Sequence, residues 1–420
     1  MKLRLPGPTT RYDLTLLAVV TALLAIGLAM VYSASGIRAL DTLDDPRYFL
    51  VQQSVWVGIG FVAMLIVARI DYHRYRVVAA VAIAVALVLL VAVLLPGVGT
   101  RVGGASRWLR ISSFAGIQPT ELAKLALVLY LAFWLGKRGD EMGRPSVTVP
   151  FALLVGGITA LVVAEPDLGT AVVVGAIGLA MYFVAGARLR EFAALAALAL
   201  VLGASAAVVQ PYRMARIVTF LDPWSDPRGS GFQTIQSLYG LALGGPFGEG
   251  LAAGKEKFGF LPAPYTDSIF AVLGNELGLW GTLTVVLLFL AIAYKGTRIA
   301  IAAPDRAGAL LATGITVWIV FQAWVNMAVV ASLVPMTGIT LPFISYGGSS
   351  ICVGLVAVGI LLNVGRQAVA PASERATVSG APRRRRDGRT REPAPRGRGS
   401  DGGAAGRRAP VHRWSSRSRG

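Results

Sequence analysis

The sequence predicts an all-α polytopic membrane protein with ten transmembrane helices and a large extracytoplasmic loop between the seventh and eighth helices. Of its 420 residues, 55% are hydrophobic and only 15% are charged, which is too apolar for a soluble protein of this size. Apolar runs of about 20 residues are long enough to cross a bilayer as helices. Such runs occur at 13–33, 50–68, 77–95, 119–136, 148–164, 168–186, 191–209, 268–294, 308–334 and 344–364.

The distribution of positive charge predicts that both termini lie in the cytoplasm. The first apolar run lacks a convincing small-residue cleavage site, so we interpret it as an uncleaved helix. Ten crossings place both termini on one side of the membrane. The short loops on that side carry 14 Lys and Arg, against 5 in the short outer loops and 5 more in the long loop 210–267. Cations favour the cytoplasmic side.

Three regions follow from this topology. We expect a cytoplasmic segment at 1–12, a membrane domain at 13–368 that includes the loop 210–267, and a disordered cytoplasmic tail at 369–420. Residues 381–420 hold 13 Arg among Pro, Gly and Ser, a composition that cannot form an apolar core. We interpret the tail as a solvated segment that touches anionic lipid, and its composition alone does not indicate binding to nucleic acid.

Cysteine and histidine are too scarce to support several kinds of site. Cys352 is the only cysteine, so no internal disulfide forms. The two histidines, His73 and His412, both fall on the predicted cytoplasmic side. This excludes a histidine-rich metal site or a Ser–His–Asp triad on the outer face. Chemistry on that face must depend on carboxylates, cations and amides.

Asp267 is the leading candidate for a catalytic group. It closes the polar stretch 210–267 and stands where an apolar helix begins. An acid at a membrane boundary indicates function, because burying a charge in lipid is costly. The alternative is an aspartate that only interacts with the dipole at the start of the helix.

Further acids and a lysine lie at or near helix starts. Glu121 and Lys124 are three residues apart, so they project from one face of a helix and suit either a phosphate ligand or a structural ion pair. Asp167 either points into an outer cavity or caps the helix that follows it. For Glu276 and Asn326 we favour structural hydrogen bonding between helices.

The outer loops supply the remaining candidates for substrate binding. Arg107 lies in the glycine-rich segment 96–118, and Ser345 lies in the hydroxyl-rich segment 335–350. The long loop contributes Arg216, Gln233 and Lys257. Its cations would neutralise a diphosphate, whereas a generic polar lid would account for its prolines and glycines.

Several short sequence motifs resemble those of a known family. They are Met30-Val-Tyr-Ser-Ala-Ser35, Ser106-Arg-Trp108, Gln118-Pro-Thr-Glu-Leu-Ala-Lys-Leu125, Glu165-Pro-Asp-Leu-Gly-Thr-Ala171, Phe220-Leu-Asp-Pro-Trp-Ser-Asp-Pro227, Gln236-Ser-Leu238, Thr266-Asp267, Phe270-Ala-Val-Leu-Gly-Asn-Glu-Leu-Gly278 and Pro335-Met-Thr-Gly-Ile-Thr-Leu-Pro-Phe-Ile-Ser-Tyr-Gly-Gly-Ser-Ser350. In this order, across nearly the whole membrane region, they resemble the SEDS family (shape, elongation, division and sporulation). Within that family the chain is more similar to the FtsW branch than to the RodA branch.

The resemblance implies a ten-helix membrane glycosyltransferase of bacteria that polymerises lipid II into peptidoglycan outside the plasma membrane, here at the division septum. It aligns Asp267 with the catalytic acid, and it implies a class B penicillin-binding protein and other divisome proteins as partners. The family usually has Pro-Glu-Ala-His-Thr-Asp before the eighth helix. Here the run is Pro262-Ala-Pro-Tyr-Thr-Asp267, and Gly-Glu-Glu becomes Gly274-Asn-Glu276.

The resemblance leads to a mechanism with defined alternatives. Asp267 would act as general base on the acceptor sugar hydroxyl. Lys124, Arg107, Arg216 and Lys257 would neutralise the leaving diphosphate, with a divalent cation such as Mg²⁺ or Mn²⁺ as a further aid whose ligands the sequence does not indicate. A lipid II flippase and a non-catalytic divisome scaffold are the alternative functions.

Overall fold

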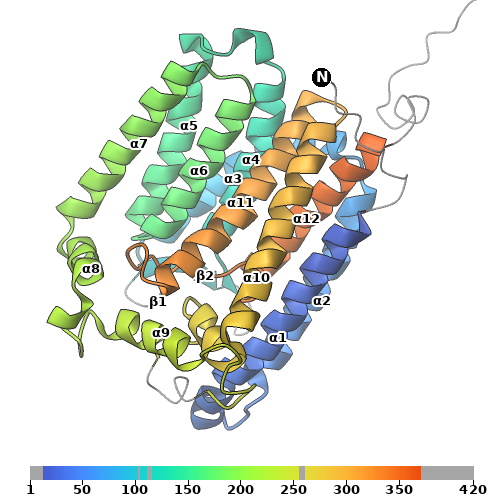
Figure 1. Ribbon diagram of the computed structural model, residues 1–420. Coiled ribbons are helices and arrows are strands. Elements are labelled where there is room, and N and C mark those ends of the chain that lie inside the picture. The colour runs from blue at the N-terminus through green and yellow to red at the C-terminus, as the bar shows by residue number, and fades with distance from the viewer. Residues whose placement is uncertain (1–12, 103–104, 111–115, 255–260, 370–420) are drawn as a thin grey trace, which may run out of the picture. The chain divides into compact units, whose positions relative to one another are not determined.

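A computed structural model describes residues 13–102, 105–110, 116–254 and 261–369 (Figure 1). All ten apolar segments of the sequence are helical in it. These helices are α1 (Leu14–Leu43), α2 (Tyr48–Arg69), α3 (Tyr75–Leu94), α4 (Pro119–Gly136), α5 (Pro145–Ala164), α6 (Leu168–Val184), α7 (Leu189–Val209), α10 (Ile269–Ala302), α11 (Arg306–Val330) and α12 (Gly348–Val369). The predicted class, a helical polytopic membrane protein, is therefore confirmed.

The number of membrane crossings stays a prediction. Within the described ranges, nine helices are long and apolar enough to cross a bilayer, and α6, with 17 residues, is apolar but shorter. The sidedness of the termini also stays a prediction. Nearly all of the segment 1–12 and the tail 369–420 lie outside the described residues.

The outer connections hold more regular structure than the sequence predicts. Two helices, α8 (Pro211–Leu221) and α9 (Phe232–Leu243), lie within the long loop. The segment between α3 and α4 forms a small antiparallel sheet in the order β1 (Thr100–Val102), β2 (Ala105–Arg110) and β3 (Gly116–Ile117). These strands are an addition to the all-α prediction. Strand pairing satisfies the backbone amides that a non-helical segment would otherwise leave without partners.

Three helices form the centre of the bundle, and one lies at its edge. About 70% of the most apolar stretch of α4, α11 and α12 is buried, whereas α7 buries none of its residues. Helix α11 packs against α4, α6 and α10, and α12 packs along α2. Figure 1 shows α7 at the margin of the bundle, where it continues into α8. Polar groups on the inner faces of α4, α11 and α12 are therefore deeply enclosed.

The segment 331–347, between α11 and α12, packs inward among the helix ends. Leu341, Phe343 and Ile344 in this segment are almost fully buried. Gly27 of α1 accommodates it, since a Cβ there would lie 2.5 Å from the carbonyl oxygen of Phe343. This irregular segment therefore packs into the bundle instead of lying on its surface.

Helix α10 is interrupted near its outer end, and the preceding loop supports the break. Gly278 has φ 66° and ψ −161°, which only glycine adopts readily. The amide N–H of Leu279 donates to the carbonyl of Gly245 at 2.9 Å. The Glu276 carboxylate accepts from the Ser33 hydroxyl at 2.5 Å and from the Ala252 amide at 3.0 Å. These contacts confirm a structural hydrogen-bonding role for Glu276.

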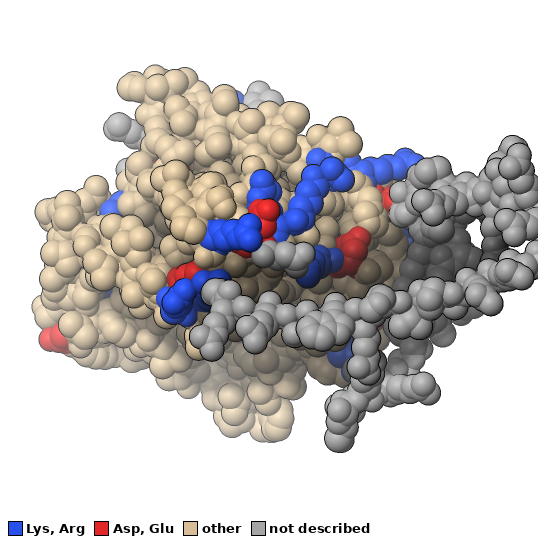
Figure 2. Space-filling model, turned by 90° about the horizontal axis from the view of Figure 1, so that it is seen from above, with Lys and Arg blue, Asp and Glu red and all other residues tan. Residues whose placement is uncertain are grey.

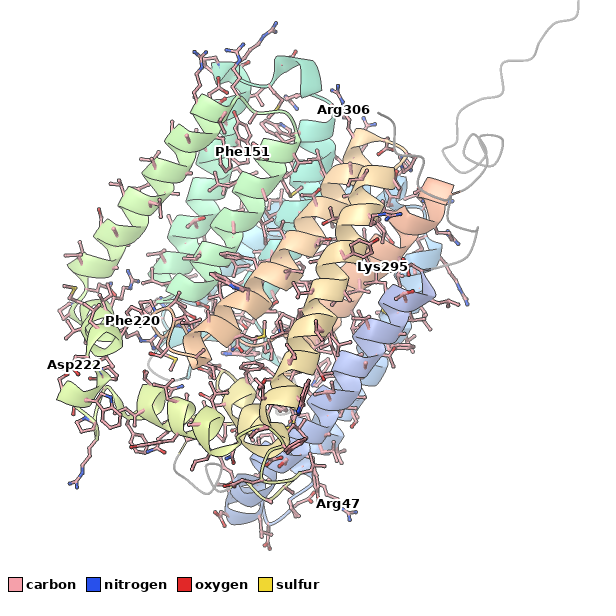
Figure 3. The ribbon with its side chains drawn as sticks, viewed as in Figure 1. Arg47, Phe151, Phe220, Asp222, Lys295 and Arg306 are labelled. Atoms are coloured by element: carbon pink, nitrogen blue, oxygen red, sulfur yellow. The ribbon has the colours of Figure 1, made fainter. Side chains whose placement is uncertain are left out.

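Positive charge gathers at the opposite end of the bundle. Figure 2, viewed from above, shows Lys and Arg over the end of the molecule that carries the loops α4–α5, α6–α7 and α10–α11. Figure 3 labels Arg306 and Lys295 near that end and Arg47 and Asp222 near the other. The basic end is the one that the sequence assigns to the cytoplasm.

Candidate active site

The Asp267 side chain lies in the turn that precedes α10 and is partly exposed. Its Oδ1 accepts from the Thr266 hydroxyl at 2.6 Å. Oδ2 has no donor among the described residues, and a Cβ placed on Gly338 would lie 3.5 Å from it. The N-cap of α10 is Ser268, and no side chain caps this helix. Among the described residues, the carboxylate therefore keeps an acceptor oxygen without a donor, and it does not serve as a helix cap.

The backbone around Asp267 is held from several directions. The Asn326 side chain of α11 donates to the Asp267 carbonyl at 2.9 Å, and the Ser345 hydroxyl donates to the Thr266 carbonyl at 2.6 Å. Gln233 of α9 donates to the Ser268 hydroxyl at 3.1 Å. Rigid placement of a catalytic group requires such supporting contacts. Asn326 has the structural hydrogen-bonding role expected from the sequence, but it joins α11 to two non-helical segments and not to another helix.

A cavity of about 210 Å³ lies between α8, α9 and the end of α11. Arg216 and Gln233, both predicted to bind substrate, contribute to its wall. Arg216 also donates to the Met336 carbonyl at 3.0 Å. Figure 3 labels Phe220, another wall residue, on α8. The cavity is lined by Ala215, Arg216, Thr219, Phe220, Ser230, Gln233, Thr234, Val329, Ser332, Val334 and Met336. Through Gln233 and Met336, this cavity borders the segments that hold Asp267.

Asp167 and Arg107 meet at the turn between α5 and α6. Asp167 caps α6, because its carboxylate accepts from the Thr170 amide at 3.1 Å and from the Thr170 hydroxyl at 2.9 Å. Arg107 lies 3.8 Å from Asp167 Oδ2 and donates to the carbonyls of Glu165 and Pro166. The capping alternative for Asp167 therefore describes its contacts. Much of the hydrogen-bonding capacity of Arg107 is used within this turn.

Glu165 is the unexpected group in this turn. It is fully buried, and neither carboxylate oxygen has a hydrogen-bond partner among the described residues. Burial and, to a smaller extent, the Asp167 carboxylate raise the pKa of Glu165, and Arg107 opposes the shift, so that the pKa lies at about 8. A carboxyl group in this environment holds its proton at neutral pH. This protonation state is not predictable from the sequence, because Glu165 lies in a short turn and its burial depends on the packing of distant segments.

Glu121 and Lys124 are enclosed in the bundle. Lys124 is 0% exposed, and its Nζ lies 2.8 Å from Glu121 Oε1 and 2.7 Å from the Gln322 side-chain oxygen. It also lies 5.0 Å from the centre of the Trp318 ring. The distances show an ion pair between the two residues, which is the structural alternative that the sequence left open. Because both side chains are buried, the structure does not directly support the prediction that they contact substrate.

Ser345 is predicted to bind substrate, but the structure gives its hydroxyl two backbone partners. It is 3% exposed, accepts from the Leu341 amide at 2.8 Å and donates to the Thr266 carbonyl. Lys257 lies outside the described residues. Two buried glutamines near the site were not predicted from the sequence. Gln322 bonds to Lys124, and Gln53 donates to the Ser345 carbonyl at 3.1 Å. Gln322 stands one helical turn before Asn326, and that spacing was a usable signal.

A metal-binding cluster is not evident in the described part of the chain. No three His, Cys, Asp or Glu side chains come together there to hold a metal ion. Mg²⁺ is commonly bound by one or two carboxylates together with substrate phosphates. The residues present therefore fit a divalent cation only if a substrate supplies several of its ligands.

Comparison with known proteins agrees with this architecture. A family model described as FTSW_RODA_SPOVE, cell cycle protein, matches residues 14–369. Stage V sporulation protein E of Bacillus subtilis is 42% identical over 363 residues, covering 85% of this chain and 98% of that protein. A protein of Trichlorobacter lovleyi named probable peptidoglycan glycosyltransferase FtsW is also 42% identical, covering 86% of this chain and 95% of its own length.

Two solved structures share the fold. One, titled as the structural coordination of polymerization and crosslinking by a peptidoglycan synthase complex, matches with a TM-score of 0.69 and 31% identity, covering 86% of this chain and 99% of the other. The rod shape determining protein RodA of Thermus thermophilus matches with a TM-score of 0.64 and 27% identity, covering 86% of this chain and 98% of the other.

Proposed function

Since this chain belongs to the FtsW/RodA/SpoVE family of cell cycle proteins, we propose that it is a peptidoglycan glycosyltransferase that polymerises lipid II at the outer face of the plasma membrane during cell division. The observation that carries the chemistry is the Asp267 carboxylate, which is partly exposed and is held by fixed backbone contacts, and of which one oxygen has no donor in the described part of the chain. This arrangement suits a proton acceptor at a polar surface beside apolar helices.

Asp267 acts as general base in this reaction. It takes the proton from the 4-hydroxyl of the acceptor sugar while that oxygen attacks the anomeric carbon of the donor. The bond from that carbon to the lipid diphosphate breaks, and the diphosphate leaves with the electron pair. Direct displacement inverts the anomeric centre, so an α-linked diphosphate becomes a β-1,4 linkage. The Thr266 hydroxyl, 2.6 Å from Oδ1, orients the carboxylate.

The leaving diphosphate requires positive charge in a cavity near Asp267. Arg216 fits this role best, because its guanidinium lines the 210 Å³ cavity and its contact with the Met336 carbonyl orients it. Arg107 and Lys257 remain further proposed ligands. A divalent cation, when bound, would neutralise the diphosphate and would depend on its oxygens for most of its ligands.

A crosslinking partner fits this function. One structure of similar fold is titled as a synthase complex that couples polymerization with crosslinking. We therefore propose that this chain works with a class B penicillin-binding protein. Other divisome proteins, septal localisation and contact of the tail with anionic lipid are proposals of the same kind.

Purified protein in vesicles with labelled lipid II tests the function against its two alternatives. Glycan chains from the wild-type protein, with or without the partner, support the polymerase. Exchange of lipid II between leaflets without glycan would identify a flippase, and neither activity with either preparation would favour a scaffold. An Asp45→Asn variant is a matched control, because Asp45 is an exposed aspartate between α1 and α2.

A further inference from the structure

A row of polar side chains runs along the buried face of α11. Trp318, Gln322 and Asn326 follow one another at intervals of four residues, so they stack on one side of the helix. Each is at most 2% exposed. Polar groups buried among apolar helices are costly unless they are hydrogen-bonded. Their partners therefore indicate what the row does.

Gln322 joins a buried cation to the outer segment. Its side-chain oxygen accepts from Lys124 Nζ at 2.7 Å and from the Trp318 ring N–H at 3.0 Å. Its side-chain nitrogen donates to the Thr340 carbonyl at 3.0 Å. One amide thus binds α4 on one side and the segment 331–347 on the other.

Asn326 continues the row towards Asp267. Its side-chain nitrogen donates to the Ile339 carbonyl at 2.7 Å and to the Asp267 carbonyl at 2.9 Å. Neighbouring carbonyls at 339 and 340 are therefore held by two amides of one helix, and one of those amides also holds Asp267. A continuous set of hydrogen bonds and one short piece of backbone connects Lys124 with Asp267.

The surroundings of Lys124 leave little for a substrate to bind. Glu121 balances its charge, Gln322 accepts a second hydrogen bond, and the Trp318 ring covers the ammonium at 5.0 Å. An ammonium group has three donors, and two of them are used by these oxygens. A diphosphate would have to displace buried partners to reach it.

We propose that Lys124 is a positioning residue that acts through Gln322 and Asn326 on the segment 339–340 and on the backbone of Asp267, and that it does not bind the diphosphate. This inference rests on the proposed glycosyltransferase activity. Displacement of a catalytic group by about 1 Å can cost a factor of 10² in rate. Loss of the row should therefore lower kcat and leave substrate binding nearly intact.

The test compares Gln322→Leu with the combined Glu121→Gln/Lys124→Met variant. The second variant removes both charges together, because a single Lys124 substitution would leave Glu121 buried and unpaired. We expect each to lower kcat for glycan synthesis about tenfold or more, with KM for lipid II within twofold of wild type. All three substitutions together should lower kcat little further, because the two variants disrupt the same connection between Lys124 and Asp267.

A matched control and a second readout separate the row from a general loss of stability. Asn363 of α12 is also a fully buried amide and donates to the Ala68 carbonyl at 2.8 Å, at the basic end of the bundle. Asn363→Ala should lower thermal stability without lowering kcat. Hydrogen exchange should accelerate in peptides 262–269 and 335–347 for Gln322→Leu and for the combined variant, but not for Asn363→Ala.

Two results would overturn the inference. One is a raised KM for the combined variant together with wild-type kinetics for Gln322→Leu, which is the pattern of a diphosphate ligand. The other is unchanged hydrogen exchange at 262–269 in both variants. A wild-type protein that makes no glycan in either preparation would instead count against the proposed function, and the exchange measurement would still decide whether the row positions Asp267.

Discussion

The two ends of the helix bundle differ in whether carboxylate oxygens are left without hydrogen-bond donors. At the basic end, the His73 ring lies between two acids, with Nδ1 2.7 Å from Asp71 and Nε2 2.6 Å from Asp305. Asp71 also accepts from Gln367, and Asp305 also accepts from the Tyr72 hydroxyl. Every carboxylate in this cluster is satisfied. It ties the turn before α3 to the start of α11 and to the end of α12.

At the other end, acceptor oxygens are left without donors. Asp267 Oδ2 and both oxygens of Glu165 have no hydrogen-bond donor among the described residues. Satisfied polar networks rigidify a structure, whereas unsatisfied buried groups lower its stability unless they serve another purpose. Asp167 and Glu276 at this same end are hydrogen-bonded through both oxygens. The difference therefore teaches that unsatisfied oxygens, more than the presence of acids, distinguish Asp267 and Glu165 from the structural carboxylates.

The largest expected effect comes from Asp267→Asn. The amide has nearly the shape of the carboxylate but cannot accept the acceptor-sugar proton, so glycan synthesis should fall by about 10²–10⁴. Thermal stability should change little, because Oδ2 loses no donor that the described ranges contain. The measurement is the polymerisation rate on lipid II, with Asp45→Asn as control. Asp267 would have no role in the chemistry if the variant polymerised at the wild-type rate.

The next largest effect should come from Ser345→Ala, which removes the hydroxyl that holds the carbonyl of Thr266. Two buried backbone groups lose a partner, at a cost of about 1–3 kcal/mol each, and kcat should fall about tenfold as the turn loosens. Ser349→Ala is the matched control, because the buried Ser349 hydroxyl has no hydrogen-bond partner within the ranges that the structure describes. Equal kcat values for the two variants would contradict a positioning role for Ser345.

The sequence predicts which segments are helical, because each apolar run is long enough to satisfy its backbone within a bilayer. It also locates Asp267 at a helix start. Hydropathy does not determine how each helix is rotated or which distant segment it meets. Ser345 was therefore expected to bind substrate, although it bonds to Thr266, 79 residues away in the chain. For Lys124, a phosphate ligand and a structural ion pair were both left open, because the sequence does not show that Gln322 of α11 encloses it.

The two remaining predictions concern stability, and the larger of the two expected effects is at Glu165. Its pKa is raised to about 8 from an ordinary value near 4.5. A raised carboxyl pKa gives a contribution that is fully present below pH 4.5 and is lost as the pH rises through about 8, because only the unfolded state ionises in between. Glu165→Gln should remove this loss. Thermal unfolding at pH 5 and pH 8 should show a smaller decrease for the variant than for wild type, and equal decreases would contradict the buried neutral acid.

The smallest effect is expected at the saturated end, for Asp305→Asn. Burial raises the Asp305 pKa, but hydrogen bonds from His73, the Gly308 amide and Tyr72 outweigh this, so the pKa is lowered from 3.8. A lowered carboxyl pKa gives a contribution that is present above pH 3.8 and is lost as the pH falls through the lower, folded-state value. Since the side chain is 37% exposed and solvent screens the interaction, the cost at neutral pH should be about 1 kcal/mol.

The Asp305→Asn substitution separates the effect of the charge from the effect of the helix cap. Asparagine can still cap α11 through the Gly308 amide, so the substitution removes the charge and leaves the cap. Thermal unfolding should show the difference from wild type at pH 7 and a smaller difference near pH 3, while the rate of glycan synthesis at pH 7 stays unchanged. A large fall in that rate would mean that the cluster at the basic end controls the chemistry at the other, and saturation of its hydrogen bonds would then not mark it as structural.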